Sequence, residues 1–297
     1  MEVWAHDRWR IPLPEGHKFP IDKYRLLRER VQESVTVLES DAVPWEWLAA
    51  VHETPLLERI RLGQLTQREQ RGLGLPWSEV LVERGRRSVG GTVAAARRAL
   101  GHGIGMNLGG GTHHAGRDFA RGYCLFNDVA VTLARMRAEG LARRALVVDC
   151  DVHQGDGTAQ LLGSDPDAFT LSLHGARNYP FERIPSDLDV DLASGTGDDE
   201  YLRVLADSLD VAIGAGKPDI AFFLAGADPW EGDRLGRLAL TKAGLQARDE
   251  LVLDRLIETG AAVVVVLAGG YAPDVVDTVD INAATVAAVV ARDRGLS

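Results

Sequence analysis

The chain contains few cysteines and few lysines. Only two cysteines, Cys124 and Cys150, occur among its 297 residues, and no Cys-x-x-Cys zinc pattern is present. Two are too few for a disulfide framework, so we expect both to be small, buried packing residues. Lysine occurs only four times whereas arginine is abundant, which we interpret as a compositional bias without mechanistic meaning.

Long apolar runs and an excess of positive charge are also absent. No run of about eighteen apolar residues occurs, so we expect no membrane span. The first residues lack a basic stretch followed by an apolar core, so we expect no secretory signal and a cytoplasmic location. The net charge of -10 argues against direct nucleic-acid binding, because phosphate binding depends on clustered lysine and arginine.

Apolar runs and amphipathic stretches alternate along the chain. Nearly uninterrupted apolar runs predict buried parallel strands at 145–148, 169–173, 220–225 and 263–267. Amphipathic stretches predict helices near 23–38, 89–100, 128–138, 199–213 and 242–257. Turn-rich segments predict surface loops at 65–77 and 185–197. This pattern predicts a doubly wound α/β sheet, in a single domain over residues 1–297.

Two glycine-rich segments carry the candidate chemistry. The first reads GGGTHHA over 109–115, and the second reads DCDVHQGDGT over 149–158. Residues two apart in an extended segment point to the same side, so Asp151 and His153 can share one ion. Carboxylate and imidazole donors together suit a borderline divalent ion such as Zn²⁺. The sequence therefore predicts the site of a metal-dependent hydrolase.

A third metal ligand must come from another segment. Asp149 has the parity of Asp151, but it would hardly reach the same ion, and we expect it to accept a hydrogen bond from an imidazole. Asp228 follows the apolar run 220–225, beyond the carboxyl end of a strand, where open α/β sheets build their sites. Three protein ligands leave a fourth position for water, which is the arrangement of catalytic zinc.

These motifs resemble those of the histone deacetylase superfamily, most closely its class IV and bacterial deacetylase-like members. Six blocks match in the family's order and at compatible spacing, at 109–115, 122–128, 149–158, 172–174, 226–228 and 269–271. The resemblance covers nearly the whole chain. It implies the arginase/deacetylase fold, an open parallel eight-stranded sheet with helices on both faces.

The resemblance also implies the metal sites. Asp151, His153 and Asp228 match the family's zinc ligands, and both Zn²⁺ and Fe²⁺ stay open as the ion. Ser172 and the backbone around the first two ligands and Asp149 match a structural monovalent-cation site, so potassium is a further expected ion. His174 is expected to be a structural histidine and not a fourth ligand.

Catalytic roles follow from the same resemblance. His113 and His114 match the family's paired histidines, of which the second is the general base. Asp149 and Asp156 match the carboxylates that orient His113 and His114 respectively. Tyr271 matches the tyrosine whose hydroxyl polarises the amide carbonyl. An imidazole held by a carboxylate can accept a proton and return it to a leaving amine, so this set has the parts of an amide hydrolase.

Substrate contacts are expected from Gly122, Tyr123 and Tyr179, with the two tyrosines flanking an extended acyl-lysine side chain. In class I members a rim aspartate, placed before the helix that we expect to start at Gly90-Gly91, grips the substrate's main chain. The corresponding stretch here, Leu73-Gly74-Leu75-Pro76-Trp77, lacks that carboxylate. Strict peptide preference is therefore not implied, and Leu75 and Trp77 are expected to favour an apolar acyl group or a small amine.

The leading functional prediction is a zinc-dependent hydrolase that removes acetyl or longer acyl groups from lysine side chains of peptides or proteins. The first alternative is a hydrolase of acylated small amines such as acetylpolyamines, which an acidic gate residue, for example Glu182 or Asp187, would favour. The second is a catalytically silent binding module. A two-manganese ureohydrolase is disfavoured, because the stretch 226–231 supplies only one aspartate. The sequence predicts no oligomeric state.

Overall fold

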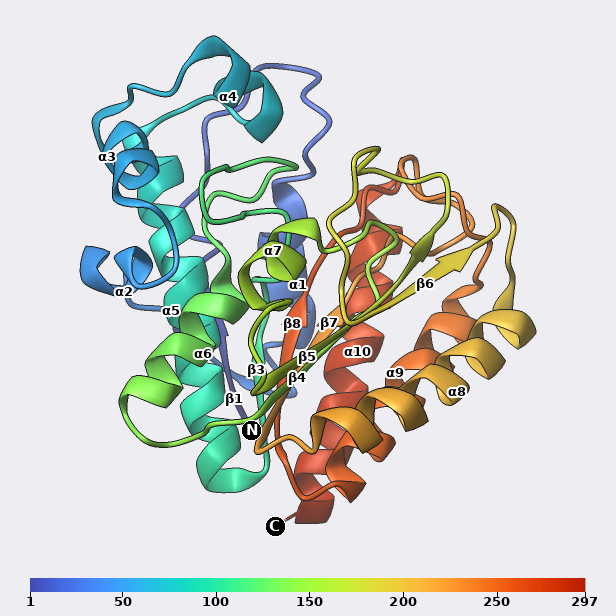
Figure 1. Ribbon diagram of the computed structural model, residues 1–297. Coiled ribbons are helices and arrows are strands. Elements are labelled where there is room, and N and C mark those ends of the chain that lie inside the picture. Colours follow the sequence, from blue (N-terminus) through green and yellow to red (C-terminus); the bar gives the residue numbers. More distant parts are fainter. Residues whose placement is uncertain (297) are drawn as a thin grey trace.

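An all-parallel sheet of eight strands forms the centre of the molecule (Figure 1). The computed structural model describes residues 1–296. The spatial strand order is β2-β1-β3-β8-β7-β4-β5-β6. The strands are β1 (Glu2–Ala5), β2 (Thr36–Glu39), β3 (Ile104–Asn107), β4 (Ala145–Asp149), β5 (Ala168–Gly175), β6 (Leu188–Leu192), β7 (Ile220–Ala225) and β8 (Ala262–Leu267). The predicted open, parallel, eight-stranded sheet is confirmed.

Helices cover both faces of this sheet (Figure 1). They are α1 (Asp22–Val31), α2 (Trp45–Ala49), α3 (Thr54–Leu62), α4 (Gln67–Leu73), α5 (Glu79–His102), α6 (Asp128–Ala138), α7 (Asp156–Leu162), α8 (Asp198–Gly216), α9 (Lys242–Glu258) and α10 (Val275–Leu296). Helices α8, α9 and α10 lie together on one face, and α5 and α6 lie on the other. None of the helices within 1–296 is long and apolar enough to cross a membrane.

The central strands are buried on both sides, which explains their uninterrupted apolar sequences. In β7, Phe223 belongs to the hydrophobic cluster under α8–α10, whereas Phe222 belongs to the cluster under α5 and α6. Successive side chains of a strand point to opposite faces, so a strand covered on both faces is apolar at every position. Cys124 and Cys150 are both buried free thiols, as expected.

The amino-terminal helices differ from the sequence prediction. The predicted helix over 23–38 ends at Val31, and the β-branched residues after it form β2. The predicted helix over 89–100 is the second half of α5, which begins after Ser78, whose side chain accepts a hydrogen bond from the Leu81 amide. Gly90 and Gly91 therefore lie inside this helix and not at its start. Position 90 requires glycine, because a Cβ there would lie 1.8 Å from the Asp41 carbonyl oxygen.

Both predicted surface loops contain regular structure. The stretch 65–77 includes α4, which begins at a capping box: Thr66 Oγ1 accepts from the Glu69 amide, and the Glu69 carboxylate accepts from the Thr66 amide. The stretch 185–197 includes β6, an edge strand whose alternating aspartates resemble loop composition. Helices α2, α3, α7 and α10 and strands β1 and β3 were not predicted either.

A buried arginine joins helix α9 to the loops that follow β4 and β7. Arg248 is fully buried, forms an ion pair of 2.7 Å with Asp249, and donates from Nη1 to the carbonyl oxygens of Gly226 (2.6 Å) and Cys150 (3.3 Å). The Asp249 carboxylate in turn accepts from Thr285 Oγ1 on α10. Arg248 thus binds the backbone of two loops at the carboxyl ends of β4 and β7, where the predicted metal ligands lie.

We expect Arg248→Met to lower the free energy of unfolding by about 3–5 kcal/mol, because it leaves the Asp249 carboxylate buried without its cation. Urea unfolding followed by circular dichroism measures this. The control is Arg203→Met, which removes an exposed ion pair with Asp207 and should change stability by no more than about 1 kcal/mol. Equal effects of the two substitutions would contradict an anchoring role for Arg248.

Candidate active site

The predicted site residues come together at the carboxyl edge of the sheet. His113 and His114 lie in the loop after β3, Asp151 and His153 follow β4, and Asp228 follows β7. Tyr271 lies in the loop after β8. These strands are neighbours in the order β3-β8-β7-β4, so segments more than a hundred residues apart in sequence converge.

Three of these residues form a possible metal site. One ligand atom each from Asp151, His153 and Asp228 lies within 4.8 Å of the others, and all three residues are buried. His153 Nδ1 lies 2.9 Å from Asp151 Oδ1 and 3.3 Å from Asp228 Oδ2. Backbone amides fix both carboxylates: Gly269 donates to Asp151 Oδ2 (2.7 Å) and Val152 donates to Asp228 Oδ1 (2.9 Å).

The electrostatics of this cluster fit a cation. Burial and the charge of Asp151 raise the pKa of Asp228, which means that two carboxylates at this spacing repel one another. Burial opposes ionisation of His153, but the carboxylates of Asp151 and Asp228 raise its pKa to about 10. The Oδ2 atom of Asp228 is buried and completes no hydrogen bond with any residue of 1–296. Two carboxylates and one imidazole nitrogen are a donor set that suits Zn²⁺ or Fe²⁺.

Glycine at position 269 is required by this arrangement. A Cβ there would lie 1.9 Å from Asp228 Oδ2 and 2.6 Å from Asp151 Oδ2. No side chain can therefore replace the hydrogen at this position without displacing the carboxylates.

Each of the paired histidines is hydrogen-bonded to its own carboxylate, at the positions that the family resemblance implies. His113 Nδ1 lies 2.6 Å from Asp149 Oδ2, and His114 Nδ1 is hydrogen-bonded to Asp156 Oδ1. Burial tends to lower the pKa of His113, but the charges of Asp149 and Asp151 raise it to about 9. Burial also lowers the pKa of His114, and the positive charges of His113 and His153 lower it further. The ring centroids of the two imidazoles are 4.1 Å apart, yet their pKa values are shifted in opposite directions.

Arg121 is a site residue that the sequence analysis missed. Its guanidinium forms an ion pair with the Asp156 Oδ2 atom, on the side of the carboxylate opposite His114, and stacks over the Phe119 ring at 4.2 Å. Its signal was a basic residue directly before the Gly122-Tyr123 block. Asp156 is thus shared between an imidazole and a guanidinium.

Two further residues fix the loop that carries Tyr271. Asp233 accepts a hydrogen bond from the Tyr271 amide (2.6 Å), and buried Lys23 donates to the carbonyl oxygens of Ala268 (3.2 Å) and Gly270 (3.4 Å). The Lys23 ammonium also lies 5.4 Å from the centre of the Tyr271 ring. Burial and the neighbouring carboxylates raise the pKa of Tyr271 well above its usual value, so the hydroxyl keeps its proton.

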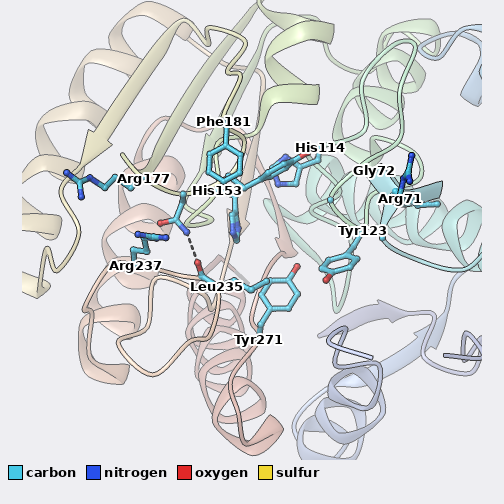
Figure 2. A pocket seen from close by; sticks show the side chains of 15 residues that line it. Arg71, Gly72, His114, Tyr123, His153, Arg177, Phe181, Leu235, Arg237 and Tyr271 are labelled. Atoms are coloured by element: carbon cyan, nitrogen blue, oxygen red, sulfur yellow. Dashed lines mark hydrogen bonds between the residues drawn. The ribbon is translucent and has the colours of Figure 1, made fainter. Parts of the chain in front are cut away.

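A pocket of about 460 Å³ leads to these groups (Figure 2). His114, His153 and Tyr271 line it, together with the predicted substrate-contact residues Gly122, Tyr123 and Tyr179. The Tyr123 and Tyr271 rings are 5.8 Å apart, and Tyr179 lies 5.0 Å from the His114 ring at a near-perpendicular angle. A Cβ at Gly122 would lie 2.5 Å from the His114 ring, so only glycine leaves that imidazole in place.

Some candidates take other places. Leu75 is buried and Trp77 donates to the Ile60 carbonyl oxygen, so neither lines this pocket. Asp187 accepts from the amide and hydroxyl of Thr170, and Glu182 does not line the pocket.

His174 and Ser172 are also accounted for. The Nδ1 atom of buried His174 lies 2.9 Å from Ser172 Oγ, and its Nε2 lies 3.3 Å from Asp191. His174 is not among the residues of 1–296 that together could hold a metal ion.

Comparisons with known proteins agree with this architecture. The model of the histone deacetylase domain matches residues 17–287. An uncharacterized protein of Picosynechococcus sp. is 42% identical over 93% of this chain and 94% of its own length. Histone deacetylase 2 of Arabidopsis thaliana is 35% identical over 63% of this chain, and the match spans 49% of that relative. Acetoin utilization protein AcuC of Bacillus subtilis is 30% identical over 66% of this chain and 56% of its own length.

Solved structures share the fold. The crystal structure of the HDA15 HD domain aligns with a TM-score of 0.79 at 22% identity, over 99% of this chain and 91% of that one. The structure of an HDAC homolog complexed with SAHA aligns with a TM-score of 0.82 at 22% identity, over 99% and 84% respectively. Because the domain match extends over most of the sequence, this chain belongs to the histone deacetylase family.

Proposed function

We propose that this protein is a metal-dependent amide hydrolase that removes acetyl or longer acyl groups from lysine side chains, with residues 1–297 acting as one catalytic domain. The observation that carries the proposal is the position of His114, held by Asp156, beside the Asp151, His153 and Asp228 cluster at the base of an aromatic pocket. Membership in the histone deacetylase family supports the same class of reaction.

The metal is the first component of the proposal. Asp151, His153 and Asp228 would hold one ion, and Zn²⁺ or Fe²⁺ both accept this set of nitrogen and oxygen ligands. When bound, the ion supplies a Lewis acid that polarises the amide carbonyl and lowers the pKa of the attacking water. A structural K⁺ near Ser172 and a cytoplasmic location stay predictions.

His114 is the proposed general base and acid. Its Nδ1 is held by Asp156, so Nε2 is the nitrogen left to exchange protons on the pocket side. It would take a proton from the attacking water and deliver it to the leaving lysine amine, a role that typically contributes about 10²–10⁴ in rate. Arg121 fixes the far oxygen of Asp156 and so keeps this carboxylate, and the imidazole bound to it, in one orientation.

Tyr271 is the proposed donor to the developing oxyanion. Its ring lines the pocket 6.5 Å from the His153 ring, and its raised pKa keeps the hydroxyl protonated. A hydroxyl that donates to the amide oxygen stabilises the tetrahedral state by a few kcal/mol, typically about 3. Asp149, which is hydrogen-bonded to His113, would compensate the positive charge of that imidazole beside His114.

Hydrolysis of acylated small amines is the second candidate. The observation that favours it is the composition of the pocket wall, which contains no carboxylate that could bind a peptide main chain. The same absence disfavours polyamines, which carry further ammonium groups, so the favoured small amines are those without a second positive charge. Release of free amine from lysine peptides and from acylated small amines separates the two candidates.

We expect the protein to bind one Zn²⁺ per chain and Asp151→Ala to lose this ion. The two remaining protein ligands bind Zn²⁺ more weakly than the three that a tetrahedral catalytic site uses. Metal analysis after dialysis measures the stoichiometry. Glu258→Ala, a substitution at an exposed position on α9, is the matched control and should retain the ion. Retention of a full equivalent by Asp151→Ala would place the metal elsewhere.

The function itself is tested by the release of free amine from acetyl-, butyryl- and myristoyl-lysine peptides and from acetylated polyamines. We expect the zinc-loaded protein to hydrolyse lysine peptides and His114→Ala to lower kcat by about 10²–10⁴ while it retains the metal. Turnover confined to polyamines would instead support the small-molecule candidate. A zinc-loaded protein that hydrolyses no member of the panel would overturn the proposed activity.

A further inference from the structure

Three arginines surround the mouth of the active-site pocket. Arg71 comes from α4, Arg177 from the loop after β5, and Arg237 from the loop after β7, and all three side chains are exposed and line the pocket. Figure 2 shows Arg177 and Arg237 on one side of the pocket and Arg71 on the opposite side. Segments far apart in sequence thus place positive charge on both sides of the entrance.

These arginines have no internal partner in the part of the chain that the structure describes: no ion pair or side-chain hydrogen bond involves any of them. Nearby arginines are used differently. Arg183 forms an ion pair with Asp191, and Arg234 donates to the carbonyl oxygens of Ala272 and Pro273. The guanidinium groups at the mouth are therefore free to meet a ligand.

The sign of this charge is unexpected for the chain. The protein has 43 acidic and 33 basic residues, yet no aspartate or glutamate lines the pocket. Glu182 and Asp187, the acidic gate residues that would favour a polyamine, do not line it. A second ammonium group on the substrate would meet only positive charge at this entrance, whereas a carboxylate would meet a guanidinium that can bind it in a bidentate manner.

We propose that the entrance selects acylated amines that carry a carboxylate next to the acylated chain, and this rests on the proposed function. The acyl-lysine side chain would lie between the aromatic rings of Tyr123, Tyr179 and Tyr271, with the amide at the metal site. The groups attached to its α-carbon then emerge between Arg71 on one side and Arg177 and Arg237 on the other. The carboxylate comes from acidic residues that flank an acetyl-lysine in a protein or from a small acylated amino acid.

The test uses three acetyl-lysine peptides of equal length that differ only in flanking glutamate, glutamine or lysine, together with free Nε-acetyl-lysine and an acetylpolyamine. We expect kcat/KM to fall in the order glutamate, glutamine, lysine. The difference between the glutamate and lysine peptides should be roughly tenfold, because a few exposed charge pairs between peptide and arginines contribute together. High salt should reduce the difference, because it screens exposed charges. Free Nε-acetyl-lysine that matches the glutamate peptide would assign the carboxylate to a small molecule.

A triple variant identifies the residues. Arg71→Gln, Arg177→Gln and Arg237→Gln together should reduce the preference to within about twofold, with kcat for the glutamine peptide retained. The control is the triple Arg97→Gln, Arg143→Gln and Arg144→Gln, which removes the same charge from exposed positions outside the pocket and should keep the preference.

Binding gives an independent readout. Fluorescence anisotropy of dye-labelled peptides should show the same order of dissociation constants. Equal affinity and turnover of the three peptides, or the same loss in both triple variants, would overturn the proposal. If no peptide is hydrolysed, the proposed function fails, and the anisotropy order still decides whether the entrance selects negative charge.

Discussion

Electrostatic repulsion between Asp151 and Asp228 is the constraint on which the active site depends. Two carboxylates are buried within a few ångströms of each other, and burial of like charges is unfavourable unless a cation compensates them. His153 lies against both, and backbone amides of Val152 and Gly269 hold the remaining oxygens. The surrounding structure therefore holds together a cluster that could bind a metal ion.

Buried cations behind the loops supply part of that structure. Arg248 binds the backbone of the loops after β4 and β7, and Lys23 binds the backbone of the loop after β8. Neither side chain lines the pocket. Both act on carbonyl oxygens, so they fix the path of the loops without competing for the carboxylates that would hold the ion. Arg121 differs, because it binds Asp156 directly and thereby fixes the imidazole of His114.

The sequence predicted the central strands of the sheet better than its edges, and it predicted which residues converge at the carboxyl ends of those strands. Strands such as β7 and β8 are apolar at every position because both faces are covered, and the polar motifs begin where these strands end. Edge strands carry no such signal: β6 contains Asp189 and Asp191 and has the composition of a loop. Helix α5 was predicted too short because Gly90 and Gly91 are poor helix formers, although close approach of the Asp41 backbone requires glycine at position 90.

Contacts between distant segments were beyond the sequence for a physical reason. Nothing in the local pattern around Arg121, Lys23 or Arg248 indicates which loop each cation binds, since these partners lie 22 or more residues away. The sequence does not predict that the arginines at the entrance lie near one another either, because they come from three separate segments and are brought together only by the fold.

The proposed metal site is tested most directly by a crystal structure of the zinc-loaded protein, with anomalous diffraction measured at the zinc edge. We predict one anomalous peak, bound by one oxygen each from Asp151 and Asp228 and by Nδ1 of His153, with His114 and Tyr271 facing the remaining side of the ion. A peak bound by other residues, or two adjacent peaks that share the carboxylates, would contradict the proposed single-metal site.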